Sequence, residues 1–197
     1  MRLPIFIFFL TLSCVSQAEL VRFRGKEARE YQLQSSKIEV VVKHPLRVVT
    51  LSSTALYGAF KKHPDHLRQG VFIALTVPFA HTDANPPQVN KWLKKNLLKR
   101  EQYTGIVFTS RIFEIEKQNK DGFVGELHGR MKMLRKGAKP VRAKAKLACR
   151  TPEKSVACQF SGTIRVSELG VEAPSLLGLK ITDEISYSGE ASFFPRI

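Results

Sequence analysis

The side chains best suited to catalysis are histidines, and their surroundings complete neither a catalytic nor a metal site. His63 and His66 in "HPDH" could bind a metal ion, but Pro64 lies between them and no third ligand is nearby in the sequence. His81 and Asp83 in "HTD" could act as a base with its carboxylate partner, yet no nucleophile accompanies them. The sequence also lacks the motifs G-x-S-x-G and H-E-x-x-H. We therefore expect a non-enzymatic protein without metal or catalytic cofactor, and a hydrolase is the least favoured alternative.

The first eighteen residues have the pattern of a secretory signal peptide. A basic residue at position 2 precedes an apolar run over residues 3–12, and small and polar residues follow up to Ala18. The apolar run has about half the length that a membrane-spanning helix needs. We expect cleavage after Ala18, a single mature domain over residues 19–197, and a periplasmic location. A retained anchor is less favoured, and so is lipid attachment at Cys14, because Thr11 stands where Leu is usual.

The chain is strongly basic, with 32 Lys and Arg against 17 Asp and Glu, and many of these cations lie in residues 125–147. Such charge is typical of nucleic-acid binding, but export, the scatter of the charges and the lack of an aromatic RNA-binding motif argue against it. Anionic lipid headgroups are a better partner, reached through a Lys-rich helix that carries Trp92. A basic face that is merely solvated is the alternative.

Alternation of apolar and polar residues dominates the sequence after residue 30 and predicts antiparallel strands with one dry face. In residues 105–115 apolar side chains fall on both faces, so the inward face stays undecided there. Residues 85–103 break the alternation and predict one amphipathic helix, with Asn85 as N-cap and Pro86 as its first residue.

Two cysteines, Cys149 and Cys158, remain after signal cleavage, too far apart for C-x-x-C redox chemistry. Cysteines in an oxidising compartment usually pair, and the turn residues midway between them predict a hairpin closed by a disulfide. This register also sets Leu147 opposite Phe160 and Ala143 opposite Ile164, so apolar residues meet apolar ones. A helix over the "AKAK" stretch is the weaker alternative.

Small residues recur on the apolar face of the predicted strands. They cannot fill a barrel interior that Phe or Leu would plug, and a barrel of about eight strands is near the width that holds one ligand. The alternative is that the glycines mark bulges and bends, and spacing alone does not separate the two. The residues concerned are Gly125, Gly129, Ala143, Ala145, Gly162, Gly189 and Ala191.

The order of six weak motifs resembles the YceI family of exported lipid-binding proteins over residues 31–194. The motifs are "YQLQSSKIEVVVKH", "VFIALTVPFAHTD", "NLLKREQYTGIVFTS", "GELHGRMK", "FSGTIRVSELGVE" and "LKITDEISYSGEASF". The chain departs from the family pattern by lacking Arg-Asp before the helix end, by Thr104 and Gly105 where Pro is usual, and by the extra "MLRKGA".

The resemblance implies an all-β fold: an extended, lipocalin-like antiparallel barrel of about eight strands with one or two short helices. It also implies an amphiphilic isoprenoid, such as a polyprenyl phosphate or a quinone, bound in the lumen. The function expected is an exported carrier that stores or transports this lipid across the periplasm. A basic envelope-surface protein that binds anionic lipid or another partner without a lumenal ligand is the alternative, and the oligomeric state, dimer included, stays open.

We expect the lumen to be lined by alternating apolar residues, although core packing would explain each one equally well. Met131 and Met133 suit an irregular hydrocarbon chain because thioethers are flexible. Arg165 is a candidate for contact with an anionic headgroup, with an exterior salt bridge as the alternative. The candidate lining residues are Ile73, Leu75, Val77, Phe108, Leu127, Met131, Met133, Leu147, Phe160, Ile164, Ile185, Tyr187 and Phe193.

Overall fold

The computed structural model describes residues 29–62, 71–85, 87–91, 104–151, 155–171, 175–176 and 178–196. The expected signal peptide with Cys14, the two histidines of "HPDH", and Trp92 with most of the Lys-rich segment lie outside these residues. Among the described residues, no helix is long and apolar enough to cross a membrane.

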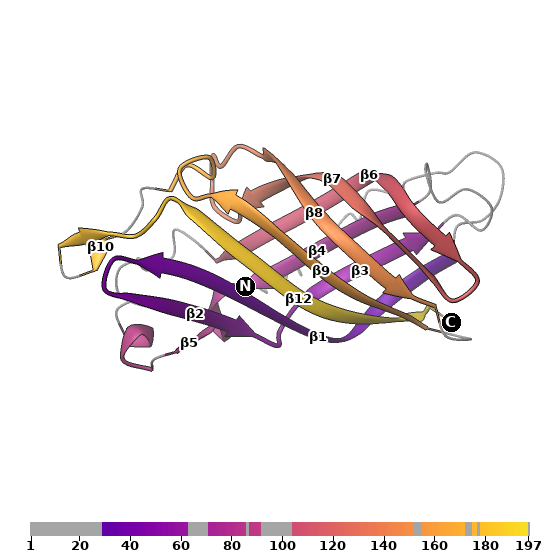
Figure 1. The fold of residues 1–197 in the computed structure, drawn as a ribbon, viewed down its shortest axis with the longest axis horizontal. Coiled ribbons are helices and arrows are strands. Elements are labelled where there is room, and N and C mark those ends of the chain that lie inside the picture. Colours follow the sequence, from indigo (N-terminus) through magenta and orange to yellow (C-terminus); the bar gives the residue numbers. More distant parts are fainter. Residues whose placement is uncertain are drawn as a thin grey trace, which may run out of the picture.

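Eight antiparallel strands close into a barrel (Figure 1). The order around the wall is β12, β9, β8, β7, β6, β4, β3 and β1, and β1 pairs with β12 again. The expected all-β antiparallel barrel is therefore confirmed. The wall strands are β1 (Arg29–His44), β3 (Tyr57–Lys62), β4 (Val71–Pro78), β6 (Gly105–Asn119), β7 (Gly122–Met133), β8 (Val141–Arg150), β9 (Val156–Arg165) and β12 (Glu184–Pro195), and the short 3-10 helix η1 (Phe79–His81) follows β4.

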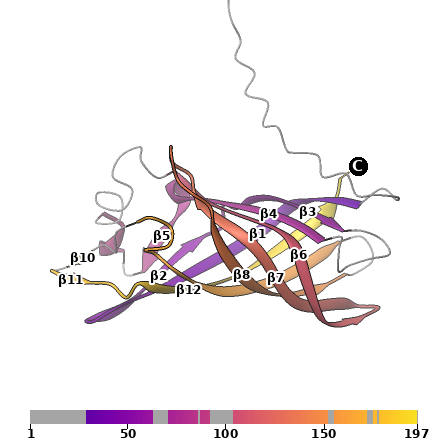
Figure 2. The same cartoon turned by 90° about the horizontal axis from the view of Figure 1, so that it is seen from above.

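Shorter strands extend one end of the barrel, which we call the mouth. The β1–β2 hairpin projects there, and β5 pairs with β2. The β10–β11 hairpin lies beside it, because the amide of Thr182 donates a hydrogen bond of 2.9 Å to the carbonyl oxygen of Lys43 on β1. Figures 1 and 2 place both hairpins at the same end. These strands are β2 (Arg47–Ser53), β5 (Asp83–Asn85), β10 (Ser175–Leu176) and β11 (Leu179–Lys180).

A helical turn over residues 88–91 follows β5 at the mouth. The side-chain oxygen of Asn90 accepts a hydrogen bond of 2.5 Å from the amide of Ala84, which fixes the turn against β5. The expectation that Asn85 is the helix N-cap was wrong, because its backbone pairs with Thr50 in the β2–β5 ladder. Strand pairing therefore overrides the local N-cap preference.

The register predicted from the cysteines is present in the β8–β9 ladder. Cys149 and Cys158 face each other and form a disulfide, and Leu147 faces Phe160. Side chains along β8 alternate regularly between buried and exposed. The helical alternative for "AKAK" is therefore wrong, because residues 141–150 form this strand.

A bulge in β6 explains why its inward face could not be read from the sequence. The register with β7 shifts between Ser110 and Ile112, so that one extra residue is inserted in β6. Phe108 faces the interior before the shift, and Phe113 and Ile115 face it afterwards. Both apolar sets therefore point inward, in different parts of one strand.

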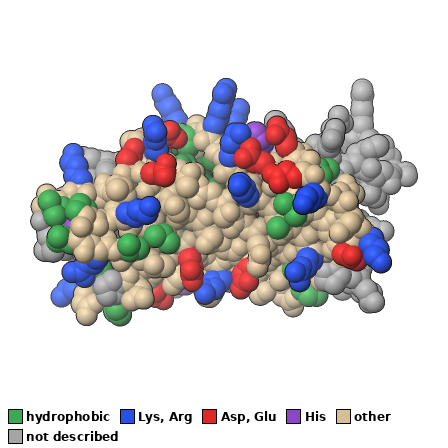
Figure 3. Space-filling model, viewed as in Figure 1, with side chains coloured by type: hydrophobic (Ala, Val, Ile, Leu, Met, Phe, Trp, Pro, Cys, Tyr) green, Lys and Arg blue, Asp and Glu red, His purple; other side chains and the backbone are tan. Residues whose placement is uncertain are grey.

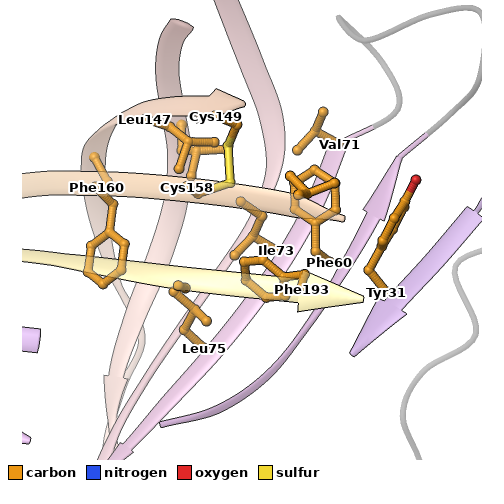
Figure 4. Packing of buried hydrophobic residues seen from close by; sticks show 14 of the residues in the cluster. Tyr31, Phe60, Val71, Ile73, Leu75, Leu147, Cys149, Cys158, Phe160 and Phe193 are labelled. Carbon is orange, nitrogen blue, oxygen red and sulfur yellow. A yellow bond between two sulfur atoms is a disulfide. The ribbon is translucent and has the colours of Figure 1, made fainter. Parts of the chain in front are cut away.

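Aromatic rings fill the closed end of the barrel, opposite the mouth. Phe60 is fully buried and lies 5.5 Å from Phe193, 5.8 Å from Tyr31 and 6.4 Å from Phe123, measured between ring centroids. Phe113 lies 5.4 Å from Phe123 in an edge-to-face contact. The disulfide and Leu147 lie in the same cluster (Figure 4). The rings and the disulfide thus form the main core of the described barrel at this end.

The glycines of the wall make room for aromatic rings that lie flat against it. A Cβ atom at Gly189 would come within 2.5 Å of the Phe160 ring, and one at Gly162 within 2.4 Å of the Tyr187 hydroxyl oxygen. Gly125 and Gly129 are covered by phenylalanine rings in the same way. The glycines were expected either to leave the lumen open or to mark bulges and bends. Neither interpretation is complete, because aromatic rings occupy the space beside them.

Candidate ligand-binding lumen

Two apolar cavities lie inside the barrel. The inner cavity, of about 90 Å³, is bounded by the aromatic closed end, and the mouth cavity, of about 160 Å³, reaches β2, η1 and residues 166–171. Five residues line both cavities, so the inner cavity and the mouth cavity are adjacent along the lumen. These shared residues are Ile38, Val40, Val77, Ile106 and Ile185.

All thirteen lining residues expected from the sequence border these cavities. Met133 lines the mouth cavity, and the other twelve line the inner one. Their contact with a ligand stays a prediction. The period-two alternation thus identified which side chains face inward, because adjacent residues of a strand point to opposite sides of the wall.

Further residues that were not expected from the sequence also line the cavities. Ile38 and Val40 on β1 border both cavities, although their alternation is visible in the sequence and would have identified them. Leu169, Val171 and Ile181 close the mouth cavity from segments outside the wall strands, where no alternation points to them.

The volume of the cavities limits what the barrel holds in this conformation. A dry apolar cavity of about 150 Å³ is known to accept one benzene molecule, and typical ligand pockets span about 300–1,000 Å³. The mouth cavity, at about 160 Å³, therefore accepts about one isoprene unit as it stands. A longer chain requires side chains such as Met131 and Met133 to move, which thioethers do readily.

Polar groups occur only on the mouth side of the described lumen lining. Ser52, Ser53, Thr82 and Asn90 border the mouth cavity, whereas the inner cavity exposes no polar surface. The Ser53 hydroxyl already accepts a hydrogen bond of 3.2 Å from the amide of Ala55. An amphiphile that enters through the mouth would therefore place its chain inward and its polar end among these residues.

The wall is not hydrogen-bonded throughout: a seam runs between β8 and β9 on the mouth side. The β7–β8 and β9–β12 ladders each contain ten residue pairs, but the β8–β9 ladder contains five and ends at Lys146 and Ser161. The expected pairs farther along, such as Ala143 with Ile164, are therefore not formed. Each strand continues, paired with its other neighbour alone.

Tyr187 of β12 lies beneath this seam. It pairs with Gly162, and its hydroxyl group donates a hydrogen bond of 3.0 Å to the carbonyl oxygen of Lys144 on β8. The ring thus passes over Gly162 from β12 to β8 and supplies a donor where β9 does not. Burial raises the pKa of Tyr187 to about 12, so the hydroxyl stays protonated at physiological pH.

A polar groove of about 800 Å³ lies on the outer surface above the seam. Tyr187 and Ile164 border both this groove and the inner cavity. Figure 3 shows the face carrying β8, β9 and β12, where few charged or hydrophobic side chains lie across the middle and charged side chains of both signs lie around it. The other residues around the groove are Val41, Glu126, Arg142, Ala143, Lys144, Lys146, Ser161, Gly162, Thr163, Glu168, Ser186 and Ser188.

Three polar residues considered from the sequence lie outside the lumen. Arg165 is exposed at the end of β9 and pairs with Glu184 across the β9–β12 ladder. It borders neither cavity, and its role with a headgroup stays a prediction. His81, which ends η1, and Asp83, which begins β5, are both exposed at the mouth.

An exterior cluster of two carboxylates and a histidine lies beside the groove. Each of Glu114, Glu126 and His128 offers one ligand atom, and these atoms lie within 4.8 Å of one another. The Nε2 atom of His128 lies 2.9 Å from Glu126 and 3.3 Å from Glu114. The amine of Lys144 lies 2.8 Å from Glu126 and holds the pKa of that carboxyl below its usual value. Lys144 already forms an ion pair with Glu126, so a bound metal ion is not needed to explain the cluster.

Comparison with known proteins identifies the fold. No family model matches the chain, and no curated protein matches it. A solved polyisoprenoid binding domain from Saccharophagus degradans, implicated in plant cell wall breakdown, is 13% identical with a TM-score of 0.63, covering 84% of this chain and 98% of that one. BcnA from Burkholderia cenocepacia is 13% identical with a TM-score of 0.59, covering 80% and 95%. The resemblance is thus confirmed for the fold, and at this identity it carries the fold alone.

Proposed function

We propose that the barrel binds an amphiphilic isoprenoid, such as a polyprenyl phosphate or a quinone, with its hydrocarbon chain in the lumen. The observation that carries this proposal is the unbroken apolar lining of the two cavities, which turns polar only toward the mouth. The polyisoprenoid binding domain with the same fold supports the choice of ligand class.

Burial of the chain supplies enough free energy for binding without catalysis. Each buried methylene contributes about 0.8 kcal/mol, so one isoprene unit contributes about 3–4 kcal/mol before ordering costs. We therefore propose a binding protein rather than an enzyme, which stores or carries the lipid in the periplasm as a mature domain over residues 19–197. An intact mass beginning at Glu19 for protein taken from the cell envelope supports export; a mass that retains the first eighteen residues excludes it.

Extraction of the native ligand tests the proposed function. The full-length protein is purified from its own envelope without detergent, extracted with organic solvent and analysed by mass spectrometry. We expect an isoprenoid in an amount approaching one per barrel, and uptake of added quinones or polyprenyl lipids by stripped protein. Protein that is empty and takes up neither would contradict the proposal.

Contact with an anionic lipid surface is the second candidate function, and the mouth hairpins favour it. Leu46, Val48 and Leu179 at their tips are 61%, 59% and 41% exposed. Residues 40–51 and 174–182 contain basic but no acidic residues. Apolar tips with basic flanks bind anionic membranes, because both burial and charge contribute. The rest of the expected Lys-rich helix, with Trp92, lies outside the described residues and is proposed to join this surface.

Liposome flotation separates membrane contact from lumenal binding. We expect the mature protein to float with vesicles of phosphatidylglycerol and not with neutral phosphatidylcholine vesicles. Leu46→Ser with Leu179→Ser should reduce flotation while uptake of the isoprenoid into the lumen is preserved. Equal absence of binding to both vesicle types would exclude the membrane contact and leave the lumenal proposal standing.

A further inference from the structure

The seam between β8 and β9 lies between the lumen and the groove on the outer surface. Tyr187 is the element between them, because it lines the inner cavity on one side and the groove on the other. The seam margins are small or apolar, with Ala143 on β8 and Gly162 and Ile164 on β9. The β8–β9 ladder does not extend here, and the Tyr187 ring lies between the cavity and the groove.

We propose that this groove binds the phosphate of a polyprenyl phosphate, whose chain enters the lumen through the seam beneath it. Arg142, Lys144 and Lys146 supply cations at the groove, and arginine and lysine are the usual partners of phosphate oxygens. The proposal rests on the proposed lumenal function and selects the anionic member of the ligand class over a quinone.

The groove offers hydroxyl donors as well as cations. Ser161 and Thr163 on β9 face the groove from one side, and Ser186 and Ser188 on β12 border it farther on. Alternation brings these four side chains to the outer face, while their neighbours Ile164 and Tyr187 face the lumen. A phosphate thus meets donors on the surface at the point where the wall admits its chain.

Two acidic residues also border the groove, and their positions decide which cations are available. The amine of Lys144 lies 2.8 Å from Glu126 and offsets the charge of this carboxylate. Glu168 lies exposed in the turn after β9. Arg142 and Lys146 flank Lys144 on the same face of β8, and Lys146 also faces Glu126 across the β7–β8 ladder. These two are the cations that the proposal assigns to the phosphate.

The geometry of Tyr187 makes it the gate of the seam. Its hydroxyl is tied to the Lys144 carbonyl at 3.0 Å, and its ring rests on a residue without a side chain. Rotation of the ring into the lumen breaks this one hydrogen bond and leaves the ladders on both sides intact. Loss of the bond should raise the rate of ligand entry about fivefold, which corresponds to one hydrogen bond of ordinary strength.

A pair of probes that differ only in the headgroup tests the groove. Geranylgeranyl phosphate and geranylgeraniol share one hydrocarbon chain, and their affinities for the mature protein are measured by equilibrium dialysis. Arg142→Gln with Lys146→Gln should weaken binding of the phosphate about tenfold and leave the alcohol unchanged. Lys117→Gln with Lys120→Gln, exposed residues near the closed end, removes the same charge and should change neither affinity.

The gate is tested through rates with Tyr187→Phe, which keeps the ring. A geranylgeranyl phosphate with an anthraniloyl group at the chain end should bind and dissociate about fivefold faster, whereas Tyr57→Phe at an exposed position should not alter the rates. Unchanged binding and dissociation rates in Tyr187→Phe would contradict the proposal that Tyr187 controls entry through the seam.

The outcomes of the dialysis separate the two proposals. If both double variants weaken binding of geranylgeranyl phosphate equally, or if neither does, the groove does not bind the phosphate. Binding of geranylgeraniol in the lumen would still stand. Failure of the native protein to bind either probe would instead overturn the proposed function.

Discussion

The hydroxyl group of Tyr187 donates a hydrogen bond of 3.0 Å to the carbonyl oxygen of Lys144, across the part of the wall where β8 and β9 are not paired. A side chain thus satisfies a main-chain acceptor that the neighbouring strand leaves without a ladder partner. Gly162 makes this contact feasible, because a Cβ atom there would collide with the phenol ring. Tyr187 therefore links β12 to β8 by a hydrogen bond at the point where the β8–β9 ladder has ended.

Removal of this hydroxyl should destabilise the barrel modestly. Tyr187→Phe keeps the ring but leaves the Lys144 carbonyl without its donor, so the free energy of unfolding should fall by about 1 kcal/mol. Urea denaturation followed by circular dichroism measures the change. Tyr57→Phe is the matched control, since Tyr57 is 61% exposed and should show no effect. An unchanged midpoint for Tyr187→Phe would show that the bond contributes nothing net.

The same tyrosine should make the barrel sensitive to alkaline pH. Burial raises its pKa to about 12, so the folded state holds the phenol proton more tightly than the unfolded chain, whose tyrosine titrates near ~10. Stability from this group is complete below pH ~10 and falls as pH rises toward ~12, by about 2–3 kcal/mol in total. Unfolding free energies of the native protein and Tyr187→Phe should therefore approach each other above pH ~9, cross near pH ~10.7, and be in reversed order by pH ~11.5. A constant difference over this range would contradict the assignment.

Asp183 should make the stability of the barrel sensitive to acid pH. The Ser167 hydroxyl donates to its carboxylate at 2.6 Å and the Ser167 amide at 2.8 Å, and these bonds hold the pKa of Asp183 below its ordinary value. The stability that they supply is present above the unfolded pKa, near ~4, and is lost as pH falls through the lower folded value. Ser167→Ala removes the hydroxyl donor and should raise the pKa of Asp183 in an NMR titration. Ser188→Ala should leave it in place.

Strand faces could be predicted from the sequence because alternation fixes them locally. The cysteines then fixed one register between distant residues, and the β8–β9 ladder follows it around Cys149 and Cys158. In β6 the alternation failed, because one inserted residue at the bulge before Ile112 changes which side chains face inward. A bulge leaves no mark in the spacing of apolar residues unless the partner strand is known.

Neither the seam nor the aromatic cluster at the closed end could be predicted from the sequence. Alternation reports the direction of side chains but not whether neighbouring backbones remain hydrogen-bonded, so Ala143 and Ile164 were expected to pair and do not. The positions of the glycines did not predict the ring packing either, because Gly189 contacts the ring of Phe160, which is distant in the sequence. Both features depend on contacts between strands, which a single sequence does not specify.

Reduction of the disulfide should weaken the closed end without changing the fold. Cys149 and Cys158 are each 3% exposed and pack in the main core, so their bridge constrains a short hairpin that other contacts also hold. Cys149→Ala with Cys158→Ala should lower the free energy of unfolding by about 2–3 kcal/mol, the value for a loop of about ten residues. Guanidinium denaturation measures it, and the circular dichroism spectrum should stay that of a β-barrel. Loss of that spectrum would mean that the bridge is required for folding.

Filling the junction of the two cavities should block the lumen from within. Val77 borders both cavities and is half-buried, so Val77→Phe places a ring in space that is now empty. Stability should change by less than about 1.5 kcal/mol, because the ring fills a void rather than displacing packed atoms. Uptake of geranylgeraniol should fall at least about tenfold, since losing room for two methylene groups already costs about 1.6 kcal/mol. Val48→Phe adds the same ring at a position that is 59% exposed and should leave uptake unchanged. Normal uptake by a stably folded Val77→Phe protein would place the hydrocarbon chain elsewhere than in this lumen.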